Sequence, residues 1–332
     1  MDDGVRETNA EKTQRPPQRK RETRDVNGWL VLDKPVGMTS THAVSVVKRA
    51  FQAKRAGHAG TLDPLASGLL PIALGEATKT VPFVMDGRKV YRFTVRWGEE
   101  RDTDDAEGRV TAVSAERATA EAIRALVPRF TGLIEQVPPR FSAVKIEGER
   151  AYDLARDGEA VELEPRPIEI HRLELVEMAD ADHGMFAAEC GKGAYVRALA
   201  RDMGRALGCF GHVVALRRTA VGPFSEEMAI GLEALPPRAP GAAAGPSSDA
   251  ASAAEAGLLL PVAAGLAALP ALRVSAADAG RLARGQPVLL RGRDAPVVEG
   301  WVSVSAHGAL VALAEVDKGE LHPRRIFNLP RA

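Results

Sequence analysis

The sequence predicts an α+β protein in which a large mixed domain precedes a small β domain. Its 332 residues, 45% of them hydrophobic, suffice for a sizeable core and for more than one domain. Some segments, such as residues 89–95, show the alternation that is typical of strands. In other segments between them, the apolar residues have helical spacing. After a Pro-, Gly-, Ala- and Ser-rich stretch, short apolar runs recur at turn spacing. We therefore expect a mixed, largely antiparallel sheet flanked by helices, followed by a small β-barrel-like unit.

Composition divides the chain into four segments. Residues 1–25 have almost no apolar side chains and are expected to form a disordered basic arm. Residues 26–232 are expected to form the large domain and residues 265–332 the small one. The low-complexity stretch between them, residues 233–264, reads as a flexible linker with a short helix near 253–260.

The elements of each domain follow from periodicity and from turn residues. A strand at 28–32 stops at Lys34-Pro35, and Thr39-Ser40 caps the next helix. Further strands are predicted at 89–95, 142–146 and 185–190, with helices within 116–132, at 152–156 and at 194–207. The small domain is expected to have strands at 287–290, 297–304, 310–316 and 326–329.

The charged residues are segregated, although 44 basic and 44 acidic residues balance to a net charge of zero. Residues 15–55 carry a basic excess of seven, and residues 191–218 an excess of five. Most of the compensating acids lie elsewhere, notably in residues 99–107. Two basic blocks suit a polyanion such as RNA, whereas the default interpretation of any single run is a solvated surface.

Other classes of protein find little support in the sequence. The two cysteines, Cys190 and Cys209, form no C-x-x-C pair, which fits a reducing cytoplasm. The acidic loop 102–108 fails the register of a calcium loop, since position six is Glu107 rather than glycine. No apolar run approaches membrane-spanning length. We therefore expect neither a metal nor a membrane anchor.

The stretch Gly57–Lys79, GHAGTLDPLASGLLPIALGEATK, centres on the one acid of GTLDP, Asp63. Pro64 keeps Asp63 out of the helical region and is suited to the first position of a helix, and apolar residues follow with buried spacing. Asp63 is therefore expected at an element boundary. From the residues alone, a helix N-cap and a catalytic acid are both open, with the cap favoured.

This stretch is similar, over more than twenty consecutive positions, to the catalytic motif of the TruB family of tRNA pseudouridine synthases, in which the matching Asp is the nucleophile. The opening GWLVLDKPVGMTS and the string GKGAYVRALARDMG also resemble that family. The resemblance implies a pseudouridine synthase fold for residues 26–232 and, more loosely, an RNA-binding PUA domain at the C-terminus.

The resemblance also implies site residues beside Asp63. Arg197 would pair with Asp63, and Tyr91 would stack on the target base and assist proton transfer. His58, Tyr195, Leu216, Lys34 and Asp105 would contact or surround the substrate. Without the resemblance, Tyr91 is a core residue, Arg197 a solvated cation at a helix start, His58 a packing residue and Lys34 a solvated strand-end lysine.

By the resemblance, the reaction is the isomerisation of uridine 55 in the T loop of tRNA, by a monomeric cytoplasmic enzyme. Neither a cofactor nor an obligatory protein partner is implied. An aspartate nucleophile attacks either the sugar C1′ or the base C6 of an extruded base. The alternatives are an RNA-guided synthase of the archaeal and eukaryotic type and a tRNA-folding chaperone that does not depend on catalysis.

Overall fold

The computed structural model describes residues 23–142, 144–146, 149–150, 163–236, 257–290 and 296–329. Most of the predicted arm and linker, and the helix predicted at 152–156, lie outside these ranges. Only the end of the helix predicted near 253–260 falls within them.

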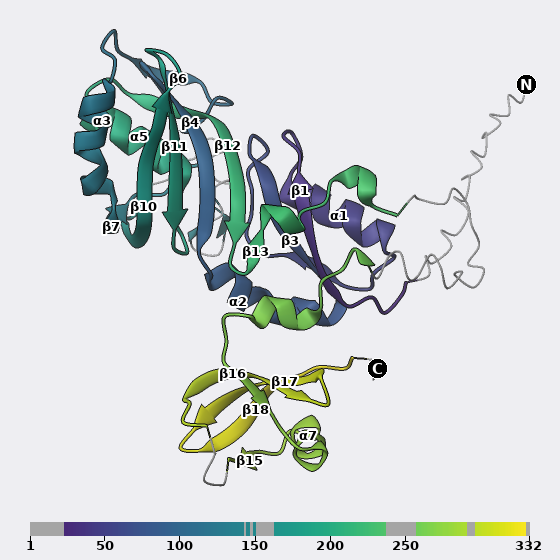
Figure 1. The fold of residues 1–332 in the computed structure, drawn as a ribbon. Helices are drawn as coiled ribbons and strands as arrows, with labels where there is room; N and C mark the ends of the chain where they lie inside the picture. Colours follow the sequence, from purple (N-terminus) through teal and green to yellow (C-terminus); the bar gives the residue numbers. More distant parts are fainter. Residues whose placement is uncertain are drawn as a thin grey trace, which may run out of the picture.

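A nine-stranded sheet forms the body of the protein (Figure 1). Its main path runs in the order β1-β3-β12-β4-β11-β10-β7, with β2 paired to β3 and β13 to β12. Every pairing is antiparallel except the parallel contact of β3 with β12. The strands are β1 (Gly28–Lys34), β2 (Ala56–His58), β3 (Ser67–Leu74), β4 (Lys89–Trp97), β7 (Gly132–Gln136), β10 (Arg166–Met178), β11 (His183–Cys190), β12 (Gly211–Val221) and β13 (Phe224–Ser225). The mixed, largely antiparallel sheet is therefore confirmed.

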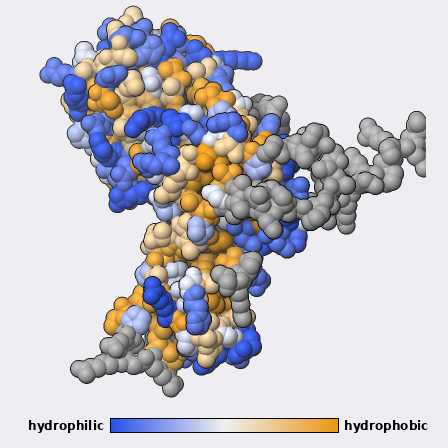
Figure 2. Space-filling view, turned by 45° about the vertical axis from the view of Figure 1, so that its right-hand side comes forward, coloured by the Kyte–Doolittle hydropathy of each residue, from blue (hydrophilic) through white to orange (hydrophobic). Residues whose placement is uncertain are grey.

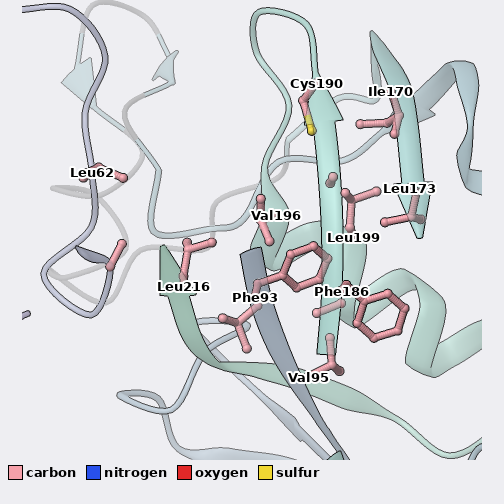
Figure 3. Close-up of a cluster of buried hydrophobic side chains, with 14 of the residues drawn as sticks. Leu62, Phe93, Val95, Ile170, Leu173, Phe186, Cys190, Val196, Leu199 and Leu216 are labelled. Carbon is pink, nitrogen blue, oxygen red and sulfur yellow. The ribbon is translucent and has the colours of Figure 1, made fainter. Parts of the chain in front are cut away.

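Helices flank this sheet and supply its core. The helices of the body are α1 (Ser40–Ala50), α2 (Val81–Asp86), α3 (Ala120–Leu126) and α5 (Val196–Ala206), with 3₁₀ helices η1 (Gly75–Thr80), η2 (Val127–Phe130), η3 (Glu226–Met228) and η4 (Leu232–Ala234). The α5 residues Leu199 and Met203 pack on Phe93 and Phe186 of the sheet, whose rings stack 5.3 Å apart (Figure 3). Two short hairpins, β5 (Glu99–Arg101) with β6 (Val110–Val113) and β8 (Lys145–Ile146) with β9 (Glu149–Arg150), lie outside the sheet.

The segment after Asp63 corrects one prediction, because a strand and not a helix follows Pro64. Asp63 accepts a hydrogen bond from the Ala66 amide in a turn, and β3 begins at Ser67. The apolar run Leu69–Leu74 is buried on both faces of the sheet, because its alternate residues pack into two different core clusters. A strand covered on both faces is continuously apolar, and short apolar runs cannot be told from a buried helix by periodicity alone. Asp63 is therefore not a helix N-cap.

A five-stranded sheet forms the small C-terminal unit, in the order β14-β16-β17-β18-β15. The predicted mostly β character is confirmed, but the last strand ends at Ile326 instead of beginning there, and the sequence missed α7 and β14. The C-terminal elements are 3₁₀ helix η5 (Val262–Leu266), β14 (Ala271–Arg273), α7 (Ala276–Ala283), β15 (Val288–Leu289), β16 (Gly300–Ala306), β17 (Ala309–Asp317) and β18 (Glu320–Ile326).

The C-terminal unit docks against the segment that follows β3. Glu76 of η1 accepts the backbone amide of Asn328 at 2.8 Å, and Lys79 donates to the Ile326 carbonyl at 2.7 Å. Phe83 of α2 meets Trp301 of β16 edge to face, with ring centroids 5.4 Å apart. Figure 2 shows hydrophobic residues gathered at the waist between the body and this unit. The segment boundaries predicted at 26, 233 and 265 remain predictions.

Candidate active site

The loop between β2 and β3 carries Asp63 to the start of α5, where it meets Arg197. The Nε of Arg197 lies 2.8 Å from Oδ2 of Asp63, and the arginine side chain is only 6% exposed whereas the aspartate is 35% exposed. Arg197 stands in the first turn of α5, where the helix dipole disfavours a cation. Asp63 supplies the carboxylate that offsets this disadvantage, and part of its side chain stays open to solvent.

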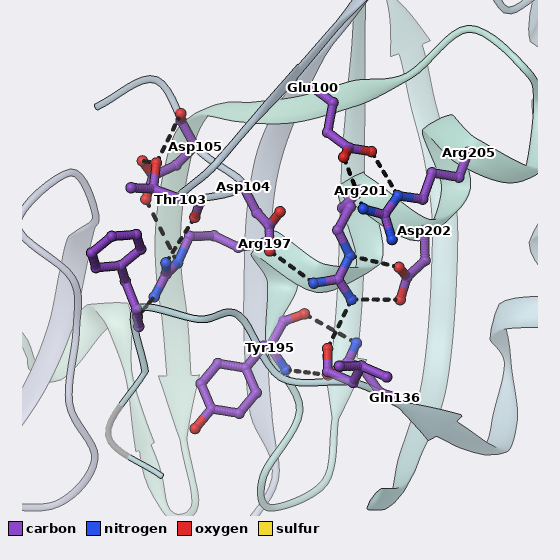
Figure 4. A network of polar contacts seen from close by, with 12 residues as sticks. Glu100, Thr103, Asp104, Asp105, Gln136, Tyr195, Arg197, Arg201, Asp202 and Arg205 are labelled. Atoms are coloured by element: carbon purple, nitrogen blue, oxygen red, sulfur yellow. Dashed lines mark hydrogen bonds and ion pairs between the residues drawn. The ribbon is translucent and has the colours of Figure 1, made fainter. Parts of the chain in front are cut away.

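The remaining donors of Arg197 are held by backbone groups of two other loops. Its Nη1 donates to the Thr103 carbonyl and its Nη2 to the Phe141 carbonyl, each at 2.9 Å. A second carboxylate, that of the buried Asp105, lies 3.7 Å from Nε. These contacts, part of which Figure 4 shows, determine the direction of the guanidinium before any substrate arrives.

Asp105 lies in an acidic loop that packs against α5. It accepts hydrogen bonds from the Thr103 hydroxyl at 2.6 Å and from the Glu107 amide at 3.1 Å. Burial raises the pKa of the Glu107 carboxyl, and the charges of Asp105 and Asp63 act in the same direction. Asp105 and Glu107 thus belong to the same electrostatic cluster as Asp63.

Lys34, at the end of β1, is fully buried rather than solvated. Its Nζ donates to the carbonyls of Pro35 and Met38 at 2.9 and 2.8 Å, and the next turn binds the Asp63 loop through the Gly37 amide and the Pro64 carbonyl. Burial lowers the pKa of Lys34 to about 8, while the negative charge of Asp63 acts to raise it. The solvated-lysine interpretation is therefore wrong.

Two tyrosines flank the Asp63–Arg197 pair. Tyr91 of β4 is partly buried and stands opposite Arg218 of β12. Tyr195, immediately before α5, exchanges two hydrogen bonds with the Gln136 side-chain amide through its own backbone amide and carbonyl (Figure 4). Burial raises the pKa of both hydroxyls.

Leu216 and His58 are the two remaining predicted residues. Leu216 of β12 is 8% exposed and packs in the same core cluster as Leu62 of the Asp63 loop (Figure 3). His58 ends β2, opposite Ile72 of β3, one short loop before Asp63. Six of the predicted residues thus lie in the surroundings of Asp63 and His58 stands where its loop begins, and the chemical roles of all of them remain predictions.

The second basic block does not form a free cationic surface. Most of its cations pair with acids, and all of these acids except Asp202 lie outside the block: Lys192 with Asp86, Arg201 with Asp104 and Asp202, Arg205 with Glu100, and Arg217 with Asp33 and Glu226. Arg197, Arg201 and Arg205 follow one another at one-turn intervals along α5 and face the acidic loop (Figure 4). Folding therefore brings compensating acids onto most cations of residues 191–218, and RNA binding by this block stays a prediction.

Sequence reasoning missed two residues that hold the Asp63 loop. The Ser40 hydroxyl donates to the Leu62 carbonyl and accepts from the Leu62 amide, at 2.9 and 2.8 Å. Arg218 is 1% exposed and donates to two carbonyls of the loop, those of Gly60 and Thr61, and to the Leu69 carbonyl of β3. The pair Arg217-Arg218 in a strand was the available signal, because alternation must turn one of two adjacent arginines inward.

Comparison with known proteins supplies the family. The N-terminal domain model of the TruB family pseudouridylate synthases matches residues 48–196. The model described as the tRNA pseudouridylate synthase B C-terminal domain matches residues 197–239, and that of the pseudouridine synthase II TruB C-terminal region matches residues 270–327. The fold resembles that of the crystal structure of a Cbf5-Nop10-Gar1 complex, with a TM-score of 0.69 and 24% identity over 90% of this chain and 84% of that one.

The family models, on a chain with this fold, define a pseudouridine synthase, an isomerase. A protein of Rhodopseudomonas palustris named tRNA pseudouridine synthase B is 68% identical over 93% of this chain and 83% of its own length. One from Agrobacterium fabrum with the same name is 55% identical over 95% of this chain and 99% of its own. The chain therefore belongs to the TruB family.

Among the described residues, no cluster of His, Cys, Asp and Glu has the arrangement of a metal site. The same part of the chain contains no helix long and apolar enough to cross a membrane.

Proposed function

We propose that this enzyme converts uridine 55 in the T loop of tRNA to pseudouridine, with Asp63 as the nucleophile. The observation that carries the proposal is the partly exposed Asp63 carboxylate, 2.8 Å from the buried Arg197 guanidinium. The name shared by relatives up to 68% identical supports tRNA as the substrate. We also propose that the enzyme acts in the cytoplasm as a monomer, without a cofactor or an obligatory partner.

The reaction keeps every atom of the uridine. Asp63 forms a bond to C1′ or to C6, the bond between N1 and C1′ breaks, and the turned base joins C1′ through C5. The bond to Asp63 also breaks, which restores the free carboxylate. The proton of C5 then leaves and N1 gains one, so that neither a redox step nor hydrolysis is needed. A single carboxylate suffices as nucleophile for either point of attack.

The surrounding residues act on this carboxylate or on the extruded base. Arg197 orients the Asp63 carboxylate, Tyr91 stacks on the base and assists removal of the C5 proton, and Tyr195 and Leu216 line the base pocket. Lys34 and Asp105 balance the charges of the pair. His58 helps to displace the extruded nucleotide.

The variant Asp63→Asn tests the nucleophile. The amide has the same shape but cannot attack carbon, so we expect tRNA affinity to be retained and product to be absent when pseudouridine is mapped in an unmodified transcript without added cofactor. Asp180→Asn, which alters an exposed carboxylate between β10 and β11, serves as the control and should leave the rate unchanged. Turnover of Asp63→Asn within about tenfold of wild type would exclude Asp63 as the nucleophile.

The same variant separates catalysis from a tRNA-folding role. The basic excess of residues 15–55 lies outside the Asp63 loop, so RNA folding that depends on charge should persist in Asp63→Asn. No specific observation favours the guide-RNA alternative, since a likeness at 24% identity concerns the fold alone. A monomer in sedimentation that is active on tRNA without added RNA or protein would agree with the proposal.

A further inference from the structure

Arg218 is, like Lys34, an almost fully buried cation beside the active site. It lies on β12 and is 1% exposed, and among the described residues no carboxylate lies within ion-pair distance of its guanidinium. A buried charge without a counter-charge is costly and is retained only where other groups satisfy it. The hydrogen-bond partners of Arg218 therefore show what this buried charge holds in place.

The partners of Arg218 are backbone carbonyls on both sides of Asp63. Nη2 donates to Gly60 at 2.9 Å and Nη1 to Thr61 at 3.4 Å, before the aspartate, whereas Nε donates to Leu69 at 2.8 Å, after it. One rigid planar group thus closes the loop that carries Asp63. A lysine, with three donors at one point, cannot reproduce this fork.

Two glycines make this close approach possible. Gly60 has a φ of +102°, and a Cβ there would lie 3.3 Å from Nη1 of Arg218. Gly68 has a φ of +97°, and a Cβ there would lie 2.2 Å from the Arg218 carbonyl oxygen. Both positions flank Asp63, and Gly60 leaves room for the guanidinium whereas Gly68 leaves room for the backbone of Arg218.

Arg218 also stands directly opposite Tyr91 in the register between β12 and β4. Burial raises the pKa of the Tyr91 hydroxyl, and the charge of Arg218 and a hydrogen bond from it act in the opposite direction. The same guanidinium that closes the Asp63 loop is therefore the cation that faces the tyrosine.

We propose that Arg218 is a positioning residue of the reaction, which fixes the nucleophile loop and places a positive charge beside the Tyr91 hydroxyl. This inference rests on the proposed roles of Asp63 and Tyr91. The positive charge stabilises the deprotonated form of the Tyr91 hydroxyl, which is the form that can accept the C5 proton, and the fork aligns Asp63 with the carbon that it attacks.

The test compares Arg218→Lys and Arg218→Met with Arg217→Lys. Arg217 is the neighbouring arginine on β12, but it is about one-third exposed and pairs with Asp33 and Glu226 away from the loop. We expect Arg218→Lys to lower the single-turnover rate by at least about tenfold with the affinity for tRNA nearly unchanged, and Arg217→Lys to leave the rate unchanged. Rates are referred to the active fraction, so that partial unfolding lowers the amplitude and not the rate.

A second readout is specific to Tyr91. The chain has only three tyrosines, so carbon-13 labelling at Cζ gives three signals, which Tyr→Phe variants assign. In Arg218→Met the titration of Tyr91 should move to higher pH, whereas Arg218→Lys, which keeps the charge, should titrate near wild type. If Arg218→Met does not fold, Arg218→Lys and its rate still decide the positioning role.

An unchanged rate per active site in Arg218→Lys would overturn the inference, as would a Tyr91 titration that does not respond to Arg218→Met. Failure of the proposed function can be distinguished from failure of the role proposed for Arg218. Activity in Asp63→Asn would overturn the proposed function, whereas an inactive Asp63→Asn beside fully active Arg218 variants would overturn only the role of Arg218.

Discussion

Arg197 and Asp63 form an ion pair of 2.8 Å at the junction of the β2–β3 loop and helix α5, and two backbone carbonyls orient the same guanidinium. The arginine is nearly enclosed, while the aspartate faces outward. The pair thus joins a fixed cation to an accessible carboxylate.

Arg197→Lys should lower the single-turnover rate by about 100-fold or more while the affinity for tRNA changes little. The lysine keeps the charge, but its point-like donors cannot reach Asp63 and the carbonyls of Thr103 and Phe141 together. Arg205→Lys, further along α5 and about half exposed, is the matched control. Equal losses in the two variants would mean that the geometry of Arg197 has no special part in the reaction.

Ser40→Ala should reduce the free energy of unfolding by about 1–3 kcal/mol, because the Leu62 amide and carbonyl would both lose a buried partner. Ser45→Ala removes an exposed hydroxyl from the same helix and should cost less than about 0.5 kcal/mol. Urea unfolding of the two variants checks the difference. A loss confined to the rate, without loss of stability, would contradict the assigned contacts.

Lys34 should give the pH–rate profile a basic limb. Its pKa, lowered by burial to about 8, means that the charge facing Asp63 is present below pH 8 and is lost above it. The single-turnover rate should therefore fall as the pH rises through about 8, and Lys34→Arg should move that limb upward, because guanidinium does not titrate there. A basic limb at the same pH in the wild type and in Lys34→Arg would mean that a group other than Lys34 titrates there.

Asp104→Asn should raise stability at pH 8 by about 1–3 kcal/mol and have little effect near pH 4. Burial raises the pKa of Asp104 from 3.8 to about 6, although Arg201 acts against the shift. The folded protein therefore binds the proton more tightly than the unfolded chain, and stability falls as the pH rises between these two values. Arg201 keeps Asp202 as a partner in the variant. Unfolding curves at pH 4 and 8 test the sign, and a loss of stability at pH 8 would show that the Arg201 pair outweighs burial.

Glu76→Gln should weaken the docking of the C-terminal unit and lower the free energy of unfolding at pH 7 by about 1–3 kcal/mol. Burial alone would raise the pKa of Glu76, but hydrogen bonds from Lys79, Asn328 and Arg55 hold it below its usual 4.5. The ionised Glu76 carboxylate therefore stabilises the folded protein above pH 4.5, and this stabilisation is lost as the pH falls below that value. Limited proteolysis and unfolding at pH 7 and 4 measure the effect, with Glu315→Gln, in an exposed pair with Arg324, as the control. Equal effects of the two variants would remove Glu76 as the docking contact.

Local pattern was enough to predict the α+β class, strands such as Lys89–Trp97 and the amphipathic helix that carries Arg197. These features depend on the period of apolar residues, which neighbours in sequence express directly. The one acid of GTLDP, together with its resemblance to a known motif, likewise singled out Asp63.

Tertiary contacts decided the rest. Whether the run after Pro64 becomes a helix or a strand depends on pairing with β1 and β12 along its two edges and on core residues that cover both of its faces, which periodicity does not record. The basic residues of α5 read as a free patch until folding brings Glu100 and Asp104 against them. Arg218 and Ser40 hold the Asp63 loop by hydrogen bonds to backbone carbonyls and amides. Every residue carries these backbone groups, so the amino-acid sequence does not show which of them a given side chain will bind.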